Sequence, residues 1–255
     1  MKLSYNTETL FNGRSIYEAL PILHEVGAKA IEFWSWADKD LHRIKELCGE
    51  YEMDVASIVV VTDTLLRPDG RSEALEEMEK AAEAARFLGC PTLVHSVGFE
   101  VEEQNREDTR EILIKGLREA APLLDKSGVT LAIEPMNTVR DKELAGYFLN
   151  TSEEAFRIVR EVDHPLVKVC YDFYHVQIME GNVISRMQNN IHRIAHIQAA
   201  GVPGRGELFA GELNYDRIFD FIKQTDYDGY VGIEYFPTHD PLGDLKEIHA
   251  KHHTG

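Results

Sequence analysis

Short apolar runs alternate with longer amphipathic stretches along the whole chain. The apolar runs are rich in Val and Ile, as in "VASIVVV" and "VKVCYD". Nearly continuous apolar runs are typical of parallel strands that are covered on both faces. The pattern predicts strands over Lys2–Tyr5, Ala30–Phe33, Val55–Val61, Thr92–His95, Thr130–Glu134, Val167–Asp172, Ile194–Gln198 and Gly232–Tyr235.

The stretches between these runs show the helical period, with apolar residues on one stripe and charged residues on the other. Glycine follows several of them, in "EVGAKAIEF", "FLGCPTLVH" and "KSGVTLAIE", where a left-handed residue can cap a helix. Helices are predicted over Ser15–Val26, Lys39–Tyr51, Arg71–Leu88, Arg106–Lys126, Thr151–Val162, Val176–Asn190 with a break near Gly181, Asn214–Gln224 and Pro241–His252.

Eight strand–helix units in 255 residues predict an α/β fold, a (β/α)8 TIM barrel, whose usual length is about 250 residues. No composition shift or Pro-rich linker divides the chain, so we expect one domain over residues 1–255. An open doubly wound sheet is the alternative. The chain lacks G-x-G-x-x-G after its first strand and lacks G-x-x-x-x-G-K-[ST], which favours the closed barrel.

Charge and cysteine content limit the partners. Lys and Arg number 27 against 44 Asp and Glu, giving a net charge of −17. Such a surface repels phosphate backbones and anionic membranes, so we expect neither nucleic acid nor membrane as a partner. Cys48, Cys90 and Cys170 are odd in number and stand in apolar surroundings, as free thiols in a reducing compartment do. With no apolar signal core in residues 1–15, we expect a cytoplasmic protein.

Four consecutive predicted strands finish in an oxygen-bearing side chain: Glu134, Asp172, Gln198 and Glu234. The active site of such a barrel lies at the carboxyl ends of its strands. The carboxylates follow apolar residues in "TLAIE", "VKVCYD" and "YVGIE", and burying them is costly unless they are paired or bind a metal. Hard oxygen ligands suit Mg²⁺ or Mn²⁺, with Co²⁺ as an alternative. From spacing alone, four polar loop starts remain a comparable interpretation.

Other candidates stand close to these ends. His175 follows Asp172 by three residues, and Arg205 lies in the Gly-rich segment "AGVPGRGE", where a guanidinium could bind a carboxylate in bidentate fashion. The alternatives are a hydrogen-bonding residue at a helix start and a surface arginine. His95 is a further candidate substrate-binding residue, and Glu32 could serve hydrogen bonding at the barrel mouth.

Aromatic residues also stand near the strand ends, namely Trp34, Trp36 and Tyr235–Phe236. They could line a pocket or an interface between subunits, so the sequence leaves a homo-oligomer open.

The segments "LAIEPMN", "VCYDFYHVQ", "AHIQAAGVPGRGEL", "GELNY" and "GYVGIEYFP" resemble hydroxypyruvate isomerase, a member of the xylose-isomerase-like TIM-barrel superfamily. The resemblance is dense over residues 129–237 and looser before them. It implies one divalent metal ion held by Glu134, Asp172, Gln198 and Glu234. It also implies that His175 and Arg205 bind substrate.

Two positions separate branches of this superfamily. Sugar epimerases usually present His at the strand-seven ligand position, where this chain has Gln198. Those related to tagatose epimerase carry a second Glu six residues after the strand-five ligand, where this chain has Arg140. The resemblance therefore favours the hydroxypyruvate isomerase branch.

The resemblance implies an intramolecular oxidoreductase that interconverts hydroxypyruvate and tartronate semialdehyde, or a related small 2-oxo-acid, through an enediolate. Glu134 and Glu234 are the expected catalytic acid–base pair. Alternatives on the same scaffold are a ketose or inosose isomerase, epimerase or dehydratase. A nuclease like endonuclease IV is disfavoured by the net charge of −17 and the sparse His at strand ends. A non-catalytic binding protein is disfavoured by the intact set of four ligands.

Overall fold

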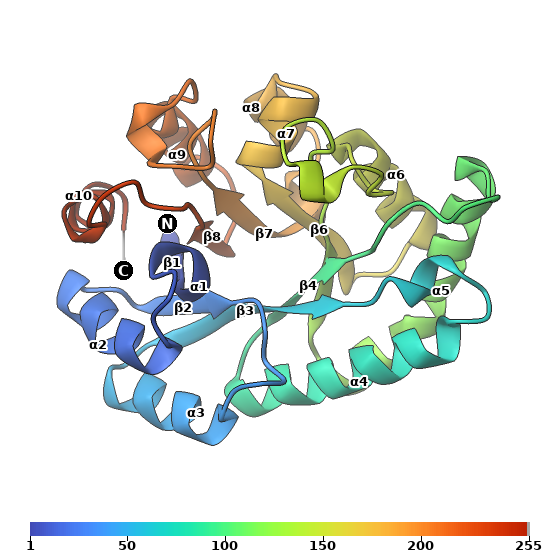
Figure 1. Ribbon diagram of the computed structural model, residues 1–255, viewed down its shortest axis with the longest axis horizontal. Coiled ribbons are helices and arrows are strands. Elements are labelled where there is room, and N and C mark those ends of the chain that lie inside the picture. The colour runs from blue at the N-terminus through green and yellow to red at the C-terminus, as the bar shows by residue number, and fades with distance from the viewer. Residues whose placement is uncertain (254–255) are drawn as a thin grey trace.

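Eight parallel strands pair in sequence order and close on themselves, because the last strand pairs with the first (Figure 1). The computed structural model describes residues 1–253; residues 254 and 255 of the predicted domain lie outside the described residues. The predicted TIM barrel is confirmed. Its strands are β1 (Lys2–Asn6), β2 (Ala30–Phe33), β3 (Asp54–Val61), β4 (Thr92–Ser96), β5 (Thr130–Ile133), β6 (Val167–Asp172), β7 (Ile194–Ala199) and β8 (Tyr230–Ile233).

The helices form an outer ring around the strands (Figure 1). Helix α10 packs against α2, so the end of the chain closes the ring beside its beginning. The helices are α1 (Thr7–Leu10), α2 (Ile16–Val26), α3 (Leu41–Glu50), α4 (Arg71–Leu88), α5 (Arg106–Ser127), α6 (Ser152–Val162), α7 (Phe173–Met179), α8 (Val183–Gln188), α9 (Tyr215–Lys223) and α10 (Leu242–His252).

Local capping explains most helix bounds. Helix α2 begins with a capping box between Ser15 and Glu18 and ends at Gly27, whose φ of 91° is left-handed. The segment predicted as one helix over Val176–Asn190 forms α7 and α8 instead. Helix α7 begins earlier because Asp172 caps it by accepting from the backbone N–H of Tyr174. The strand therefore passes directly into a helix at one of the predicted site residues.

The predicted bounds of the last strand were wrong by two residues. Strand β8 pairs with β1 from Lys2↔Tyr230 to Tyr5↔Ile233, whereas the sequence pattern placed it over Gly232–Tyr235. The apolar segment offers several registers, and pairing with β1 and β7 selects one. Glu234 consequently follows β8 directly.

The barrel interior is distinct from the core between strands and helices. Val94, Ala132 and Cys170 form a small buried cluster of their own. They alternate with residues such as Leu93 and Leu131, which belong to the large core. Since successive strand residues face opposite sides, the small cluster lies on the inner face of the barrel.

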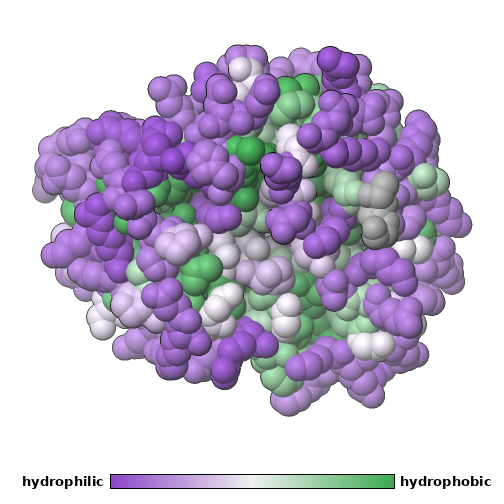
Figure 2. Space-filling model, turned by 180° about the vertical axis from the view of Figure 1, so that it is seen from behind, coloured by the Kyte–Doolittle hydropathy of each residue, from purple (hydrophilic) through white to green (hydrophobic). Residues whose placement is uncertain are grey.

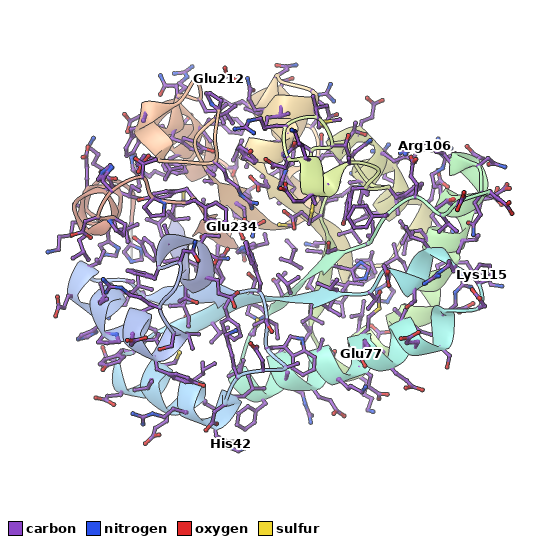
Figure 3. All side chains as sticks on the ribbon, viewed as in Figure 1. His42, Glu77, Arg106, Lys115, Glu212 and Glu234 are labelled. Carbon is purple, nitrogen blue, oxygen red and sulfur yellow. The ribbon has the colours of Figure 1, made fainter. Side chains whose placement is uncertain are left out.

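The outer surface is predominantly hydrophilic on the face seen in Figure 2. Charged residues such as Glu77 and Lys115 lie on the outer helices, while Glu234 lies within the ring (Figure 3). The three cysteines are free and buried, as the sequence predicted. Among residues 1–253, none of the helices combines the length and apolar character that crossing a membrane requires.

Candidate active site

The four predicted ligands all lie at the carboxyl end of the barrel. Glu134 directly follows β5, Asp172 ends β6, Gln198 lies in β7 and Glu234 directly follows β8. Asp172 and Gln198 are register partners across adjacent strands. All four side chains are buried, with exposed fractions of 5% for Glu134, 1% for Asp172, 2% for Gln198 and 2% for Glu234. The fold thus holds three carboxyl groups away from water at one end.

Two of these carboxyl groups approach a buried imidazole. Glu134, Asp172 and His175 offer atoms that all lie within 4.8 Å of one another. Nε2 of His175 lies 3.5 Å from Oδ2 of Asp172 and 3.9 Å from Oε1 of Glu134. Within the described part of the chain, Oδ2 of Asp172 is buried without a hydrogen-bond partner. A buried oxygen of this kind is costly, and a bound cation would offset that cost.

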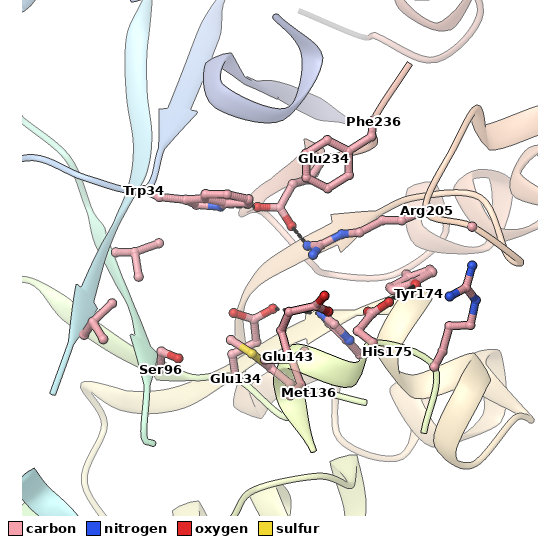
Figure 4. A pocket seen from close by; sticks show the side chains of 16 residues that line it. Trp34, Ser96, Glu134, Met136, Glu143, Tyr174, His175, Arg205, Glu234 and Phe236 are labelled. Atoms are coloured by element: carbon pink, nitrogen blue, oxygen red, sulfur yellow. Dashed lines mark hydrogen bonds and ion pairs between the residues drawn. The ribbon is translucent and has the colours of Figure 1, made fainter. Parts of the chain in front are cut away.

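The carboxyl group of Glu234 is held on both oxygens. Oε1 accepts hydrogen bonds from Asn6 Nδ2 at 2.9 Å and from Trp34 Nε1 at 2.6 Å. Nη2 of Arg205 donates to Oε2 at 2.5 Å, the contact drawn as a dashed line in Figure 4. These donors fix the direction of the Glu234 carboxyl before any ligand binds.

The positive charge near Glu134, Asp172 and Glu234 is too small to keep their carboxyl groups ionised at their usual pKa values. Burial, then the charges of Glu234 and Asp172, raises the pKa of Glu134 well above its usual value. Burial likewise raises the pKa of Asp172. Burial raises the pKa of Glu234 to about 7, although Arg205 acts in the opposite direction. Hard oxygen donors whose ionised form is disfavoured in this way are suited to a divalent cation, which stabilises that form.

His175 has a defined protonation state. Its Nδ1 accepts a hydrogen bond from the backbone N–H of Asn137 at 3.0 Å. A backbone N–H can only donate, so in the neutral ring the proton is on Nε2. Burial lowers the pKa of His175 well below its usual value, which keeps the ring neutral. His175 therefore presents an N–H donor to the cluster rather than a lone pair for a metal.

A cavity of about 610 Å³ opens above this cluster. Glu134 and His175 line one side of it, and Trp34, Phe236 and Arg205 line the opposite side (Figure 4). The sequence left open whether these aromatic residues line a pocket, and these two do. Tyr235 is fully buried, and Trp36 packs against the core.

Other residues at the cavity were not anticipated as lining residues. Ser96, Met136, Arg140 and Tyr174 all line it. Ser96 could have been found, because it shares the strand face of Val94 and therefore points inward.

The structure does not bring His95 to the cavity. Its Nε2 lies 3.1 Å from Oγ1 of Thr62, and the neighbouring Ser96 lines the cavity instead. Because adjacent residues of a strand face opposite sides, His95 points away from the barrel interior. Glu32 does point inward, but it lies beneath the cavity beside Gln198.

Buried acidic residues around a cavity at the carboxyl ends of a closed parallel barrel define a TIM-barrel protein of enzyme type. The chain belongs to the xylose isomerase-like TIM barrel family, whose model matches residues 20–251.

Relatives of known sequence confirm the resemblance to hydroxypyruvate isomerases. The chain is 38% identical over 158 residues to a 2-oxo-tetronate isomerase of Cupriavidus necator, covering 62% of this chain but only 60% of that protein. It is 28% identical over 251 residues to the hydroxypyruvate isomerase of Escherichia coli, covering 93% and 94% of the two chains. Both relatives are named as isomerases.

A solved structure has nearly the same fold. It is described as an AP endonuclease, family 2, from Brucella melitensis, and it superposes with a TM-score of 0.90 at 28% identity over 99% of each chain.

Proposed function

We propose that this protein is a metal-dependent isomerase that interconverts hydroxypyruvate and tartronate semialdehyde, or a four-carbon 2-oxo-acid and its isomer. The observation that carries the proposal is the buried carboxyl cluster joined to Arg205 through Glu234 and Asp172. The names of the two sequence relatives support the same class of reaction.

The proposed metal ligands are Glu134, Asp172, Gln198 and Glu234. Oδ2 of Asp172, which makes no hydrogen bond within residues 1–253, and the raised pKa values of the carboxyl groups support this set. Oxygen donors favour Mg²⁺ or Mn²⁺, with Co²⁺ as a substitute. When bound, such an ion polarises a substrate carbonyl and stabilises negative charge on the neighbouring oxygens.

The reaction moves protons but leaves the carbon chain intact. One proton leaves the hydroxymethyl carbon of hydroxypyruvate, and one is added to the former carbonyl carbon. The hydroxyl proton moves to the former carbonyl oxygen, so that the enediolate intermediate gives the aldehyde. We assign the two carbon-bound proton transfers to Glu134 and Glu234, one acting as base and the other as acid. The hydrogen bonds from Asn6 and Trp34 orient Glu234 for this task.

His175 and Arg205 are proposed to bind the substrate. The Nε2–H of His175 donates to a substrate oxygen, since its Nδ1 is occupied by the N–H of Asn137. The Nε of Arg205 is buried and, among the described residues, makes no hydrogen bond. Arg205 therefore retains donor capacity for a substrate carboxylate, although its Nη2 already contacts Glu234.

A metal-depletion assay tests this function. Chelated protein is expected to be inactive, and Mg²⁺, Mn²⁺ or Co²⁺ is expected to restore turnover of hydroxypyruvate or a four-carbon 2-oxo-acid above that of ketoses. Faster turnover of a carboxylate-free ketose would favour the sugar isomerase or epimerase alternative. Full activity after complete chelation would reject the metal-dependent mechanism.

A nuclease function is the alternative suggested by the name of the Brucella structure. The net charge of −17 opposes binding to a polyanion. Incision of abasic DNA by this protein would overturn the isomerase proposal. The free buried cysteines support the proposed cytoplasmic location.

A further inference from the structure

The carboxylate of Glu32 lies inside the barrel beneath the proposed metal site and is buried. Its Oε2 accepts hydrogen bonds from Ser4 Oγ at 2.7 Å and from His196 Nε2 at 2.9 Å. Its Oε1 accepts from Gln198 Nε2 at 3.3 Å. Two strands other than its own, β1 and β7, supply these three donors.

The space for this carboxylate exists because position 232 is glycine. A Cβ atom at Gly232 would lie 2.3 Å from Oε2 of Glu32 and 2.6 Å from Oε1. A side chain at that position would therefore displace the carboxylate. The barrel interior is shaped around Glu32, which fixes its position relative to Gln198.

Gln198 differs from the other three proposed ligands in one chemical respect. Both atoms of a carboxylate are oxygens, whereas an amide presents either an oxygen or an NH₂ group. Only the oxygen can coordinate a hard cation. The proposed role of Gln198 therefore requires that its amide take one of two orientations.

Glu32 selects that orientation. With Nε2 of Gln198 donating to Glu32, Oε1 faces β6, where it accepts from Cys170 Sγ at 3.1 Å. Cys170 and Asp172 lie two residues apart on the same strand face, and Asp172 is the register partner of Gln198. In the reversed orientation the amide oxygen would face the Glu32 carboxylate, with no proton between them.

We propose that Glu32 is a positioning residue that holds the oxygen of Gln198 toward the metal site. The inference rests on the proposed ligand role of Gln198 and deepens it. Groups that orient ligands from behind typically change metal affinity about 10–100-fold when they are removed.

The first test measures Mn²⁺ affinity by calorimetry, with folding verified by circular dichroism and thermal unfolding. Glu32→Gln replaces a group that can only accept with an amide that can also present its NH₂ group to Gln198. The orientation of Gln198 is then no longer enforced, and Mn²⁺ binding is expected to weaken about 10–100-fold. Ser4→Ala is the matched control, since it removes another donor to the same carboxylate without touching Gln198, and is expected to change the affinity less than about threefold. If Glu32→Gln does not fold, Glu32→Asp keeps the charge beside His196 and withdraws it from Gln198.

A reciprocal exchange separates positioning from general disruption. In Gln198→Glu, both atoms facing the metal site are oxygens, but two carboxylates now face each other. Adding Glu32→Gln to that variant restores a donor–acceptor pair, so it is expected to strengthen Mn²⁺ binding. Glu32→Gln should thus weaken binding beside Gln198 and strengthen it beside a glutamate. The visible spectrum of bound Co²⁺ should change in Glu32→Gln and return toward that of the wild type in the double variant.

The outcomes distinguish this inference from the proposed function. Equal Mn²⁺ affinity of the folded wild type and Glu32→Gln overturns the positioning role alone. The positioning role is also overturned if Glu32→Gln changes the Mn²⁺ affinity in the same direction in the wild type and in Gln198→Glu. Failure of the wild-type protein to bind Mn²⁺ overturns the proposed metal site together with this inference.

Discussion

Nη2 of Arg205 lies 2.5 Å from Oε2 of Glu234 and 3.7 Å from Oδ2 of Asp172, so one guanidinium contacts carboxyl groups from two strands. The backbone of Arg205 is left-handed, with φ of 56°. Its carbonyl oxygen accepts from the backbone N–H of Phe236 at 2.8 Å, which ties the loop after β7 to the segment after β8. The guanidinium is therefore positioned by the loop backbone as well as by its charge partners.

Removing this guanidinium should affect carboxylate-bearing substrates selectively. Hydrogen bonds to charged groups contribute about 1.5–3 kcal/mol, so Arg205→Ala is expected to raise the KM for hydroxypyruvate about 10–100-fold. The inhibition constant of dihydroxyacetone, which lacks the carboxylate, should change much less. Arg217→Ala, at an exposed position of α9, serves as the control. An equal effect on both molecules would contradict a carboxylate-binding role.

The acid–base assignment predicts a loss of turnover without a loss of fold. Glu134→Gln and Glu234→Gln keep the side-chain shape but remove the group that exchanges protons, so kcat should fall about 10²–10⁴-fold in each. Glu143→Gln is the matched control, because Glu143 lines the same cavity but has no assigned proton transfer. Steady-state kinetics and circular dichroism check the prediction. Near-normal kcat in both Glu134→Gln and Glu234→Gln would reject the assignment.

The barrel and its four strand-end residues could be predicted because both depend on local patterns. An apolar run that finishes in an acidic residue indicates where a strand ends and which end carries the site. Glu32 and His196 stand 164 positions apart and meet only across the closed barrel. Their pairing could not be read from local sequence.

The errors of the sequence-based prediction concern which face of a strand a residue occupies and where a strand ends. His95 and Ser96 are adjacent, and a one-residue error exchanges the inner and outer faces. Strand β8 lies in "GYVGIEYF", where Tyr235 and Phe236 continue the apolar segment beyond the strand, and its bounds follow from pairing with β1 and β7. The pairing of β8 depends on closure of the barrel, which the composition of the segment does not specify.

The tautomer of His175 predicts which substitutions at this position retain activity. The Nε2–H is the proposed donor to substrate, and Nδ1 accepts from Asn137. In His175→Gln the amide NH₂ can reach the position of Nε2, whereas in His175→Asn the amide occupies the position of Nδ1. His175→Gln should therefore retain about tenfold more kcat/KM than His175→Asn, as expected for one hydrogen bond to a developing charge.

The measurement is kcat/KM for hydroxypyruvate with Mn²⁺ present, with the bound metal content determined for each variant. Equal metal content would support a donor role, because His175 lies close to Glu134 and Asp172 and could otherwise act as a ligand. A loss of bound metal in both variants would contradict the donor role and favour direct ligation.

Metal stabilisation should depend on pH, because the pKa of Glu234 is raised by burial to about 7 from its usual 4.5. Between these values the folded state binds more protons than the unfolded state, so the stability of metal-free protein falls as pH rises through this window. A bound cation requires the ionised carboxylates and releases their protons. Thermal unfolding with chelator and with Mn²⁺ should therefore show a larger Mn²⁺-induced rise in Tm at about pH 8 than at about pH 6. Glu234→Gln should reduce that difference, whereas Glu143→Gln should retain it. A rise in Tm that is equal at both pH values, or larger at the lower one, would show that Mn²⁺ binds elsewhere than at these carboxyl groups.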